Sequence, residues 1–225
     1  MNSYKVIFLD IDGVINSVQY DIWNHNHKHR YGLVDPREIH RLVRFIDRYN
    51  IKLVISSSWR NGNSYKDCID EFTKDSKIHH DLDLLIPYII GVTPYHNSRH
   101  RGTEIGIFMD VLYDYNCENS NKMQSYYPIY KEHFEIEKYV IVDDDNDMLD
   151  EQMKNFVQTN PWTGLTKKDY RTFLTLLNPI CPHITEELNE MLGFKPLCET
   201  AWPEYDEAKT IDSEKEIPVQ INGKV

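Results

Sequence analysis

Cysteine is scarce in this chain of 225 residues, long apolar runs are absent, and one sign of charge dominates. The four cysteines form no CxxC pair and stand far apart, which argues against a zinc ribbon and against a secreted disulfide framework. No apolar stretch approaches the roughly 20 residues that a membrane span needs, and the first residues enter a strand-like segment without a signal peptide. These absences predict a soluble, cytoplasmic protein that makes no use of a membrane.

Basic residues are also outnumbered. The chain has 25 lysines and arginines against 36 aspartates and glutamates, so its formal net charge is -11 at pH 7. A chain this acidic is not expected to bind nucleic acid through its overall field, which leaves local basic patches for such contacts. Apolar residues make up 40% of the sequence, enough for the core of one α/β domain with an appendage.

The most informative segment present is VIFLDIDGV, residues 6–14. Its apolar start predicts a short buried strand, and Asp10 and Asp12 follow where that strand should end. Residues i and i+2 of an extended chain point the same way, so both carboxylates could face one site. Two anions this close repel each other unless a cation or a shared proton intervenes. The segment indicates either a metal-dependent site or an acidic turn, and Gly13 lets the backbone turn sharply.

Strands and helices alternate along the rest of the chain. The expected strands cover residues 5–9, 52–55 and 137–142, with one more inside the apolar segment 84–92. The expected helices start at Asp35-Pro36, cover residues 64–75, and run from 101 to 115. This alternation predicts an α/β fold with a mainly parallel sheet. Sites in such sheets lie at the carboxyl ends of strands, where this sequence places aspartates and serines.

Four motifs occur in a fixed order: FLDIDGV, VISSSWR, RGTEI and VIVDDDNDM. Together they resemble the motifs of the haloacid dehalogenase (HAD) superfamily. The residues of these motifs, together with the later segment FVQTNPWTGLT, most resemble the small HAD domains associated with RNA-repair proteins. The resemblance covers about residues 4–177. It implies a HAD-like Rossmannoid three-layer sandwich with a minimal cap.

The resemblance also implies a Mg²⁺-dependent phosphohydrolase that works through an aspartyl-phosphate. Asp10 would be the nucleophile, and Asp12 would protonate the leaving group and then activate water. The metal ligands would be Asp10, Asp143, Asp144 and Asp12, the last through its backbone carbonyl. Such an oxygen-only set suits Mg²⁺. Asp147 is the alternative to Asp144 as the second acidic group of the last motif.

Phosphate contacts are implied for a serine and an arginine. Ser56 would donate a hydrogen bond to one phosphoryl oxygen and Arg101 would hold a second. Ser57 is the alternative to Ser56, and the serines of 56–58 also fit a helix N-cap. Arg101 stands where the superfamily more often has lysine, which keeps the charge and changes the geometry. Arg60 either pairs with a structural carboxylate or reaches the substrate.

The expected substrate is large. Neither interval between the first three motifs is long enough for a full cap domain, and lids usually exclude water from sites for small substrates. An open site fits a terminal phosphate on RNA or DNA, or on a nucleotide. Four basic or histidine side chains could line a path for such a polyanion, although each also fits an ordinary solvated charge: Lys28, Arg30, Arg99 and His100.

The last fifty residues resemble a different family. LLNPICPHITEEL (176–188), AWP (201–203) and VQINGKV (219–225) are similar to the end of the anticodon-binding domain of leucyl-tRNA synthetase. We therefore divide the chain into a HAD-like domain, 1–177, and a synthetase-like fragment, 178–225, made of one helix and an irregular tail. No HIGH or KMSKS motif occurs, so aminoacylation is not expected.

The fragment has four basic and ten acidic residues, a poor composition for holding tRNA by itself. A fusion remnant without activity is favoured over a tRNA-binding module. The alternative function is a non-catalytic tRNA- or RNA-associated binding module, or a truncated synthetase-like protein that does not aminoacylate.

Overall fold

The computed structural model describes most of the HAD-like part and the helical start of the appendage. The described residues are 2–23, 34–60, 64–73, 81–96, 100–116, 130, 132, 134–178, 182–191 and 193–199. Lys28, Arg30, Arg99 and the tail from residue 200 onward lie outside them.

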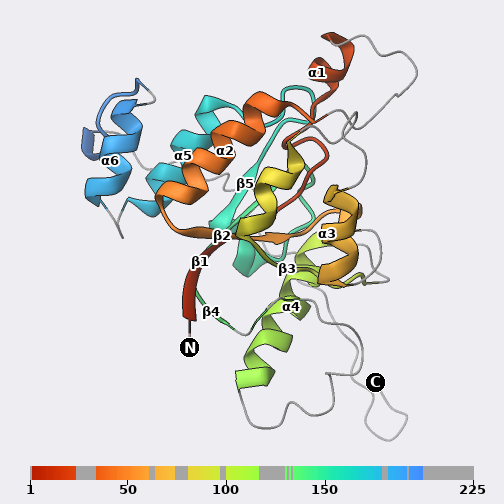
Figure 1. The fold of residues 1–225 in the computed structure, drawn as a ribbon. Helices are drawn as coiled ribbons and strands as arrows, with labels where there is room; N and C mark the ends of the chain where they lie inside the picture. The colour runs from red at the N-terminus through yellow and green to blue at the C-terminus, as the bar shows by residue number, and fades with distance from the viewer. Residues whose placement is uncertain are drawn as a thin grey trace, which may run out of the picture.

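The centre of the molecule is a five-stranded sheet in which every strand pair is parallel, in the order β3-β2-β1-β4-β5 (Figure 1). The strands are β1 (Asn2–Leu9), β2 (Ile51–Ile55), β3 (Ile89–Val92), β4 (Phe134–Asp143) and β5 (Phe156–Gln158). The helices are α1 (Val18–Trp23), α2 (Pro36–Arg48), α3 (Tyr65–Thr73), α4 (Arg101–Asn116), α5 (Lys167–Leu177) and α6 (Pro182–Met191).

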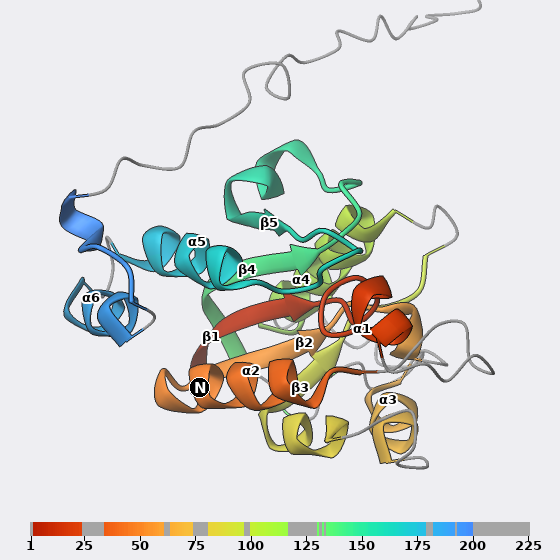
Figure 2. The ribbon, with the colours of Figure 1, turned by 90° about the horizontal axis from the view of Figure 1, so that it is seen from above.

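Helices cover both faces of the sheet. In Figures 1 and 2, α2 and α5 lie side by side over one face, and α4 lies against the other. The ring of Phe8 in β1 stands 5.7 Å from that of Phe108 in α4. On the opposite face, Phe45 of α2 stands 6.3 Å from Phe173 of α5. The predicted three-layer α/β sandwich with a parallel sheet is confirmed.

Helix α2 begins where the sequence predicts. The Asp35 carboxylate accepts a hydrogen bond from the Arg37 N–H at 2.9 Å, and a proline occupies the first turn, where its missing N–H costs nothing. The buried side chains recur at helical spacing, at Ile39, Leu42, Phe45 and Ile46. Capping and periodicity are local signals, which is why the sequence predicts this helix correctly.

Two parts of the sheet differ from the expectations, and helices α1 and α5 were not predicted. The apolar segment 84–92 holds a strand only from Ile89, because a 3₁₀ helix (Leu82–Tyr88) that contains Pro87 occupies its first part. Strand β5, Phe156–Gln158, was not predicted. Three residues are too few for an alternating pattern, so only the pairing of Val157 with Val142 of β4 reveals the strand.

No large insertion covers the carboxyl ends of the strands in the described part of the chain. The described residues between β1 and β2 hold α1 and α2, and those between β2 and β3 hold α3 and short 3₁₀ turns. The minimal cap stays a prediction, because residues 24–33, 61–63 and 74–80 of these intervals lie outside the described residues.

The described start of the appendage docks on the core. Helix α6 lies beside α5 in both views (Figures 1 and 2), and the Thr185 hydroxyl donates to the Asn178 side chain at 2.6 Å. Arg48 of α2 forms an ion pair with Glu187 of α6. No helix in the described part of the chain is both long and apolar enough to cross a membrane.

Candidate active site

Polar side chains stand at the carboxyl end of every strand of the sheet. They are Asp10 after β1, Ser56 after β2, Thr93 after β3, Asp143 at the end of β4 and Thr159 close after β5. The backbone ladder extends into these residues, since the Asp10 N–H donates to Val142 at 3.0 Å and the Ser56 N–H donates to Leu9 at 2.9 Å. The sheet therefore holds the site residues in place through their backbone.

Strand order explains why this edge can hold a ligand. The chain goes from β1 to β2 and β3 on one side, then crosses to β4 and β5 on the other. The connections diverge at such a switch point and leave a crevice outside the carboxyl ends of the strands. Asp10 and Asp143 lie on the two adjacent strands, β1 and β4, that border this point.

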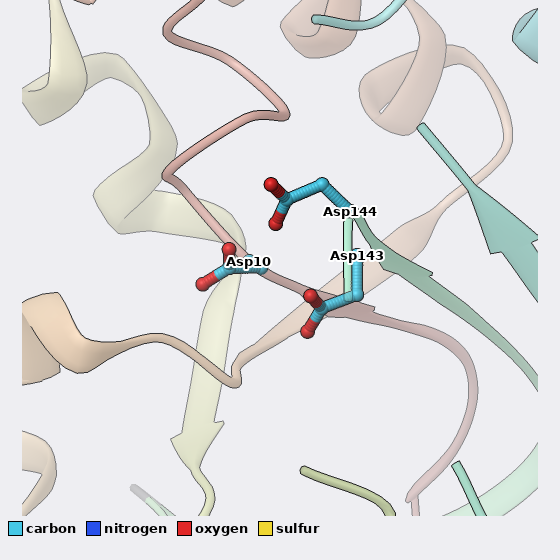
Figure 3. Close-up of side chains that lie close together, drawn as sticks. All are labelled: Asp10, Asp143 and Asp144. Carbon is cyan, nitrogen blue, oxygen red and sulfur yellow. The ribbon is translucent and has the colours of Figure 1, made fainter. Parts of the chain in front are cut away.

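Three carboxylates meet there. Asp10, Asp143 and Asp144 each offer an oxygen, and these oxygens all lie within 4.8 Å of one another (Figure 3). Asp10 is 4% exposed and Asp143 is 1% exposed. Within the described part of the chain, no hydrogen bond reaches the buried Asp10 Oδ1 or Asp143 Oδ2. Both oxygens face the guanidinium of Arg101, at 3.2 Å from Asp143 Oδ2 and 3.7 Å from Asp10 Oδ1. One arginine beside three carboxylates leaves an excess of negative charge, which a bound cation would offset.

The protonation of the cluster follows from its surroundings. Burial raises the pKa of Asp10 well above its ordinary value, and the neighbouring Asp143 raises it further. Burial likewise raises the pKa of Asp143 to about 7, against the lowering effect of Arg101. The pKa of Asp144 is also raised, by burial and then by Asp145. A bound cation would favour the charged form of all three groups and offset these shifts.

An oxygen-only cluster of this kind fits Mg²⁺ better than a soft metal ion. Asp10, Asp143 and Asp144 would hold the ion, and the structure brings these three predicted ligands together. The Asp12 carboxylate is not part of this group. A metal contact from Asp12 would come from its backbone carbonyl and stays a prediction.

Arg101 stands beside the cluster at the first position of α4. Its Nε lies 3.2 Å from Asp143 Oδ2, and its Nη2 lies 3.7 Å from Asp10 Oδ1. Burial by itself would lower the pKa of Arg101, but Asp10 and Asp143 raise it above its ordinary value. The guanidinium therefore stays charged and faces both strand ends.

Asp147 has a different position from Asp144. Its Oδ2 accepts a hydrogen bond from the Arg101 N–H at 2.9 Å, so it caps the start of α4. Its contact there is with the helix, whereas Asp144 lies with Asp10 and Asp143. Of the two alternatives for the second acidic group, the geometry favours Asp144.

Asp12 is held by residues that the sequence did not single out. Its Oδ1 accepts hydrogen bonds from Asn16 Nδ2 at 2.7 Å and from Trp59 Nε1 at 2.9 Å, and the Ser58 hydroxyl lies 3.4 Å from Oδ2. The Asn16 side chain also accepts from the Gly13 N–H at 2.8 Å. The tryptophan belongs to the VISSSWR motif. Its contact with Asp12 could not be predicted, because it forms only when the loop after β2 packs against the loop after β1.

Gly13 makes the closest approach in the site. Its φ is +68°, and a Cβ at this position would lie 2.4 Å from Asp144 Oδ2. Only glycine tolerates both conditions. Its carbonyl accepts a hydrogen bond from the Thr159 hydroxyl at 2.8 Å, a contact across the sheet that the sequence did not reveal.

The three serines after β2 have different surroundings. Ser56 and Ser57 are both fully buried, and the Ser56 hydroxyl lies 3.3 Å from that of Thr93. A hydrogen bond from Ser57 lowers the pKa of Asp10, so the Ser57 hydroxyl is the one in contact with the expected nucleophile. The geometry thus favours Ser57 over Ser56 for a phosphate contact at Asp10.

A cavity of about 1070 Å³ lies away from these residues, against α4 and the first part of β4. None of the predicted site residues lines it. Its size alone therefore does not make it the active site, because the carboxylates and the arginine lie elsewhere.

Known proteins resemble two parts of this chain. Residues 6–170 match a family described as the HAD domain in Swiss Army Knife RNA repair proteins. Residues 130–225 match the anticodon-binding domain of tRNA ligase. The leucine–tRNA ligase of Alkaliphilus oremlandii (strain OhILAs) is 66% identical over 62 residues, which are 27% of this chain and 8% of that protein. The chain thus matches a small part of the ligase. No solved structure matches.

Proposed function

Because residues 6–170 match the family over most of the chain, the protein belongs to the HAD domains of Swiss Army Knife RNA repair proteins, and we propose that it is a Mg²⁺-dependent phosphohydrolase. The observation that carries the proposal is the cluster of Asp10, Asp143 and Asp144 beside Arg101, at the switch point of the sheet. Phosphoryl transfer needs a nucleophile, neutralised charge and a proton donor for the leaving oxygen. The cluster and its neighbours offer all three.

The proposed reaction has two steps. A carboxylate oxygen of Asp10 attacks phosphorus, the bond from phosphorus to the ester oxygen breaks, and Asp12 gives that oxygen a proton. Water then attacks the aspartyl-phosphate, Asp12 takes its proton back, and inorganic phosphate leaves with Asp10 restored. Bound Mg²⁺ would neutralise phosphoryl charge. Arg101 and the Ser57 hydroxyl would hold the remaining phosphoryl oxygens.

The geometry of Asp12 supports its role as acid and base. Asn16 and Trp59 both donate to Oδ1, so this oxygen is held in place. The other oxygen, Oδ2, has only the long 3.4 Å contact with Ser58 among the hydrogen bonds of the described residues. Oδ2 is therefore the oxygen that can carry the exchanged proton.

We propose a terminal phosphate on RNA or DNA as the substrate. The family description names RNA repair proteins. The intervals between the first three motifs are too short for a full cap domain, which favours a long substrate. Trp162, in the loop after β5, is 52% exposed and offers an aromatic face on which an unpaired base can stack.

Hydrolysis of a generic aryl phosphate tests the enzyme class. Wild type should turn over this substrate with Mg²⁺ and lose activity with EDTA. Asp10→Asn should lower kcat about 1,000-fold or more, as expected for the loss of a nucleophile. Asp70→Asn, a change of an exposed carboxylate in α3, is the matched control and should stay active. Turnover without metal or without Asp10 would contradict the mechanism.

A second assay tests the substrate. A 3′-phosphorylated oligonucleotide is compared with a panel of small phosphate esters by kcat/KM. A clear preference for the oligonucleotide supports a nucleic-acid end. Equal or better turnover of a small ester would remove that part of the proposal and leave the phosphohydrolase.

The alternative is a tRNA-associated binding module without catalysis. It is favoured by the match of residues 130–225 to the anticodon-binding domain of tRNA ligase. Binding of a labelled tRNA is measured for the full chain and for a chain that ends at Glu199. Binding that is lost on this truncation, in a protein without Asp10-dependent turnover, would support the alternative.

A further inference from the structure

One buried carboxylate beside the proposed site binds two arginines at once. Glu104 of α4 is 2% exposed. Its Oε2 lies 2.7 Å from Arg60 Nη2 and 3.2 Å from Arg101 Nη1. Its Oε1 accepts a hydrogen bond from the His96 N–H at 3.0 Å. Glu104 is thus held from the loop after β3 while it bridges two cations.

The first arginine connects Glu104 to the serine loop. Arg60 is 4% exposed, and its Nη1 donates to the Ser57 carbonyl at 2.8 Å. Burial lowers the pKa of Arg60, and Glu104 opposes this shift. Because Ser57 and Glu104 occupy its Nη atoms, Arg60 acts as the partner of a structural carboxylate, which answers the question that the sequence left open.

The second arginine connects Glu104 to the carboxylate cluster. Arg101 reaches Asp143 at 3.2 Å and Asp10 at 3.7 Å on one side and Glu104 at 3.2 Å on the other. Three acidic groups therefore share this guanidinium. The position of the guanidinium therefore depends on the electrostatic attraction of each of the three carboxylates.

We propose that Glu104 is a positioning residue that orients the Arg101 guanidinium toward the substrate phosphate. Through Arg60, which donates to the Ser57 carbonyl, Glu104 also fixes the position of Arg101 relative to Ser57. The inference rests on the proposed phosphohydrolase function. Without the Glu104 charge, Arg101 would be drawn toward Asp10 and Asp143 and would neutralise the nucleophile in place of a phosphoryl oxygen. The nearby positive charge of Arg60 would push it in the same direction. A misplacement of about 1 Å can cost on the order of 100-fold in rate.

The test is Glu104→Gln, which keeps the shape and removes the charge. We expect kcat/KM for an aryl phosphate to fall about 10- to 100-fold, and inhibition by inorganic phosphate to weaken by a similar factor. The matched control is Glu38→Gln, at a half-buried carboxylate of α2 that pairs with Arg41. The control should keep wild-type kcat/KM and phosphate inhibition.

Glu104→Gln leaves Arg60 buried without its partner charge, which can also destabilise the fold. The double variant Arg60→Met/Glu104→Gln removes both buried charges, and we expect it to recover Tm but not activity. Activity is compared per folded molecule, with the folded fraction taken from circular dichroism. Recovery of wild-type kcat/KM along with Tm would show a merely structural role and overturn the inference.

The failure of the inference differs from the failure of the proposed function. If wild type shows no Asp10-dependent turnover, the phosphohydrolase proposal fails and the inference fails with it. If wild type is active and Glu104→Gln retains its kcat/KM and phosphate inhibition, the inference alone is wrong.

Discussion

The indole Nε1 of Trp59 donates a hydrogen bond to Oδ1 of Asp12 at 2.9 Å, across 47 positions of sequence. The contact joins the loop after β2 to the loop after β1. Since Asn16 donates to the same oxygen, Asp12 is held on one side and left accessible on the other. The orientation of the proposed acid and base therefore depends on the loop that carries the serines proposed to bind phosphate.

Trp59→Phe removes only the N–H donor of this contact. We expect kcat for an aryl phosphate to fall about 10-fold, the effect of one hydrogen bond of about 1 to 1.5 kcal/mol, with little change in KM. Steady-state kinetics with Mg²⁺ measures both constants. Trp23→Phe, at the exposed tryptophan that ends α1, is the control. Unchanged kcat in Trp59→Phe would show that Asp12 does not need the indole.

Gly13→Ala tests the close approach to Asp144. The new methyl group would lie 2.4 Å from Asp144 Oδ2, so we expect loss of Mg²⁺-dependent activity and a lower Tm. Gly193→Ala is the control, because Gly193 also has a positive φ, +79°, but nothing lies within 4 Å of its added Cβ. Both changes carry a backbone cost of about 1 to 2 kcal/mol. If both variants kept the same Mg²⁺-dependent activity, Gly13 would not be needed for the position of Asp144.

The pKa of Asp143, about 7, predicts how pH acts on stability without metal. Between pH 4 and 7 the folded protein holds a proton at Asp143 that the unfolded chain, with an ordinary pKa, has released. The contribution of this group to stability therefore decreases as pH rises through that window. Bound Mg²⁺ would compensate at high pH, where it has no proton to displace.

We thus expect Mg²⁺ to raise Tm more at pH 8 than at pH 5.5, measured by thermal unfolding with and without the ion. In Asp143→Asn this pH dependence of the Mg²⁺ effect should become weaker. A Mg²⁺ effect that is larger at pH 5.5 would contradict the assignment of these carboxylates as ligands.

Asp144→Asn and Asp147→Asn separate the two alternatives for the last motif. Asp144 lies with the carboxylate cluster, so its change should raise the Mg²⁺ concentration needed for half-maximal activity about 10-fold or more. Asp147 caps α4, so Asp147→Asn, which retains a capping side chain, should alter that concentration little. Activity is measured over a Mg²⁺ titration. The reverse order of the two effects would make Asp147 the second acidic group.

Truncation tests the division of the chain. All proposed site residues precede α5, so a chain that ends at Glu199 should retain Asp10-dependent turnover. A chain that ends at Asn178 also loses α6 and the residues after it. Two buried core side chains, Leu188 and Leu197, are lost with them. Burial of such side chains is worth about 1.5 to 3 kcal/mol each, so we expect Tm to fall by about 5 °C or more. An equal Tm for both chains would mean that α6 adds nothing to the core.

The sequence predicted those parts of the fold that depend on neighbours along the chain. The cap at Asp35, the apolar spacing of α2 and the polar residues that follow β1, β2 and β4 are local patterns. They sufficed for the α/β class and the parallel sheet. Strand β5 was missed because its three residues gain their stability from pairing with β4.

The candidate site divides in the same way. Asp10, Asp143 and Arg101 could be proposed from motifs, since each follows a strand or starts a helix in a recognisable order. Their assigned roles stay predictions, but their proximity is a finding of the structure. The motifs already placed Asp144 before Asp147, and the geometry favours the same order. They placed Ser56 before Ser57, and only the contact of Ser57 with Asp10 favours the reverse.

By itself, the sequence determined which chemical groups stand at the strand ends, because hydrophobic periodicity and turn residues act within a few positions. Only the tertiary structure decided which partners those groups have. Glu104 binds Arg60 across 44 positions, and Thr159 holds Gly13 across 146. Such contacts form when distant segments pack on one sheet, and a single sequence carries no local signal for them.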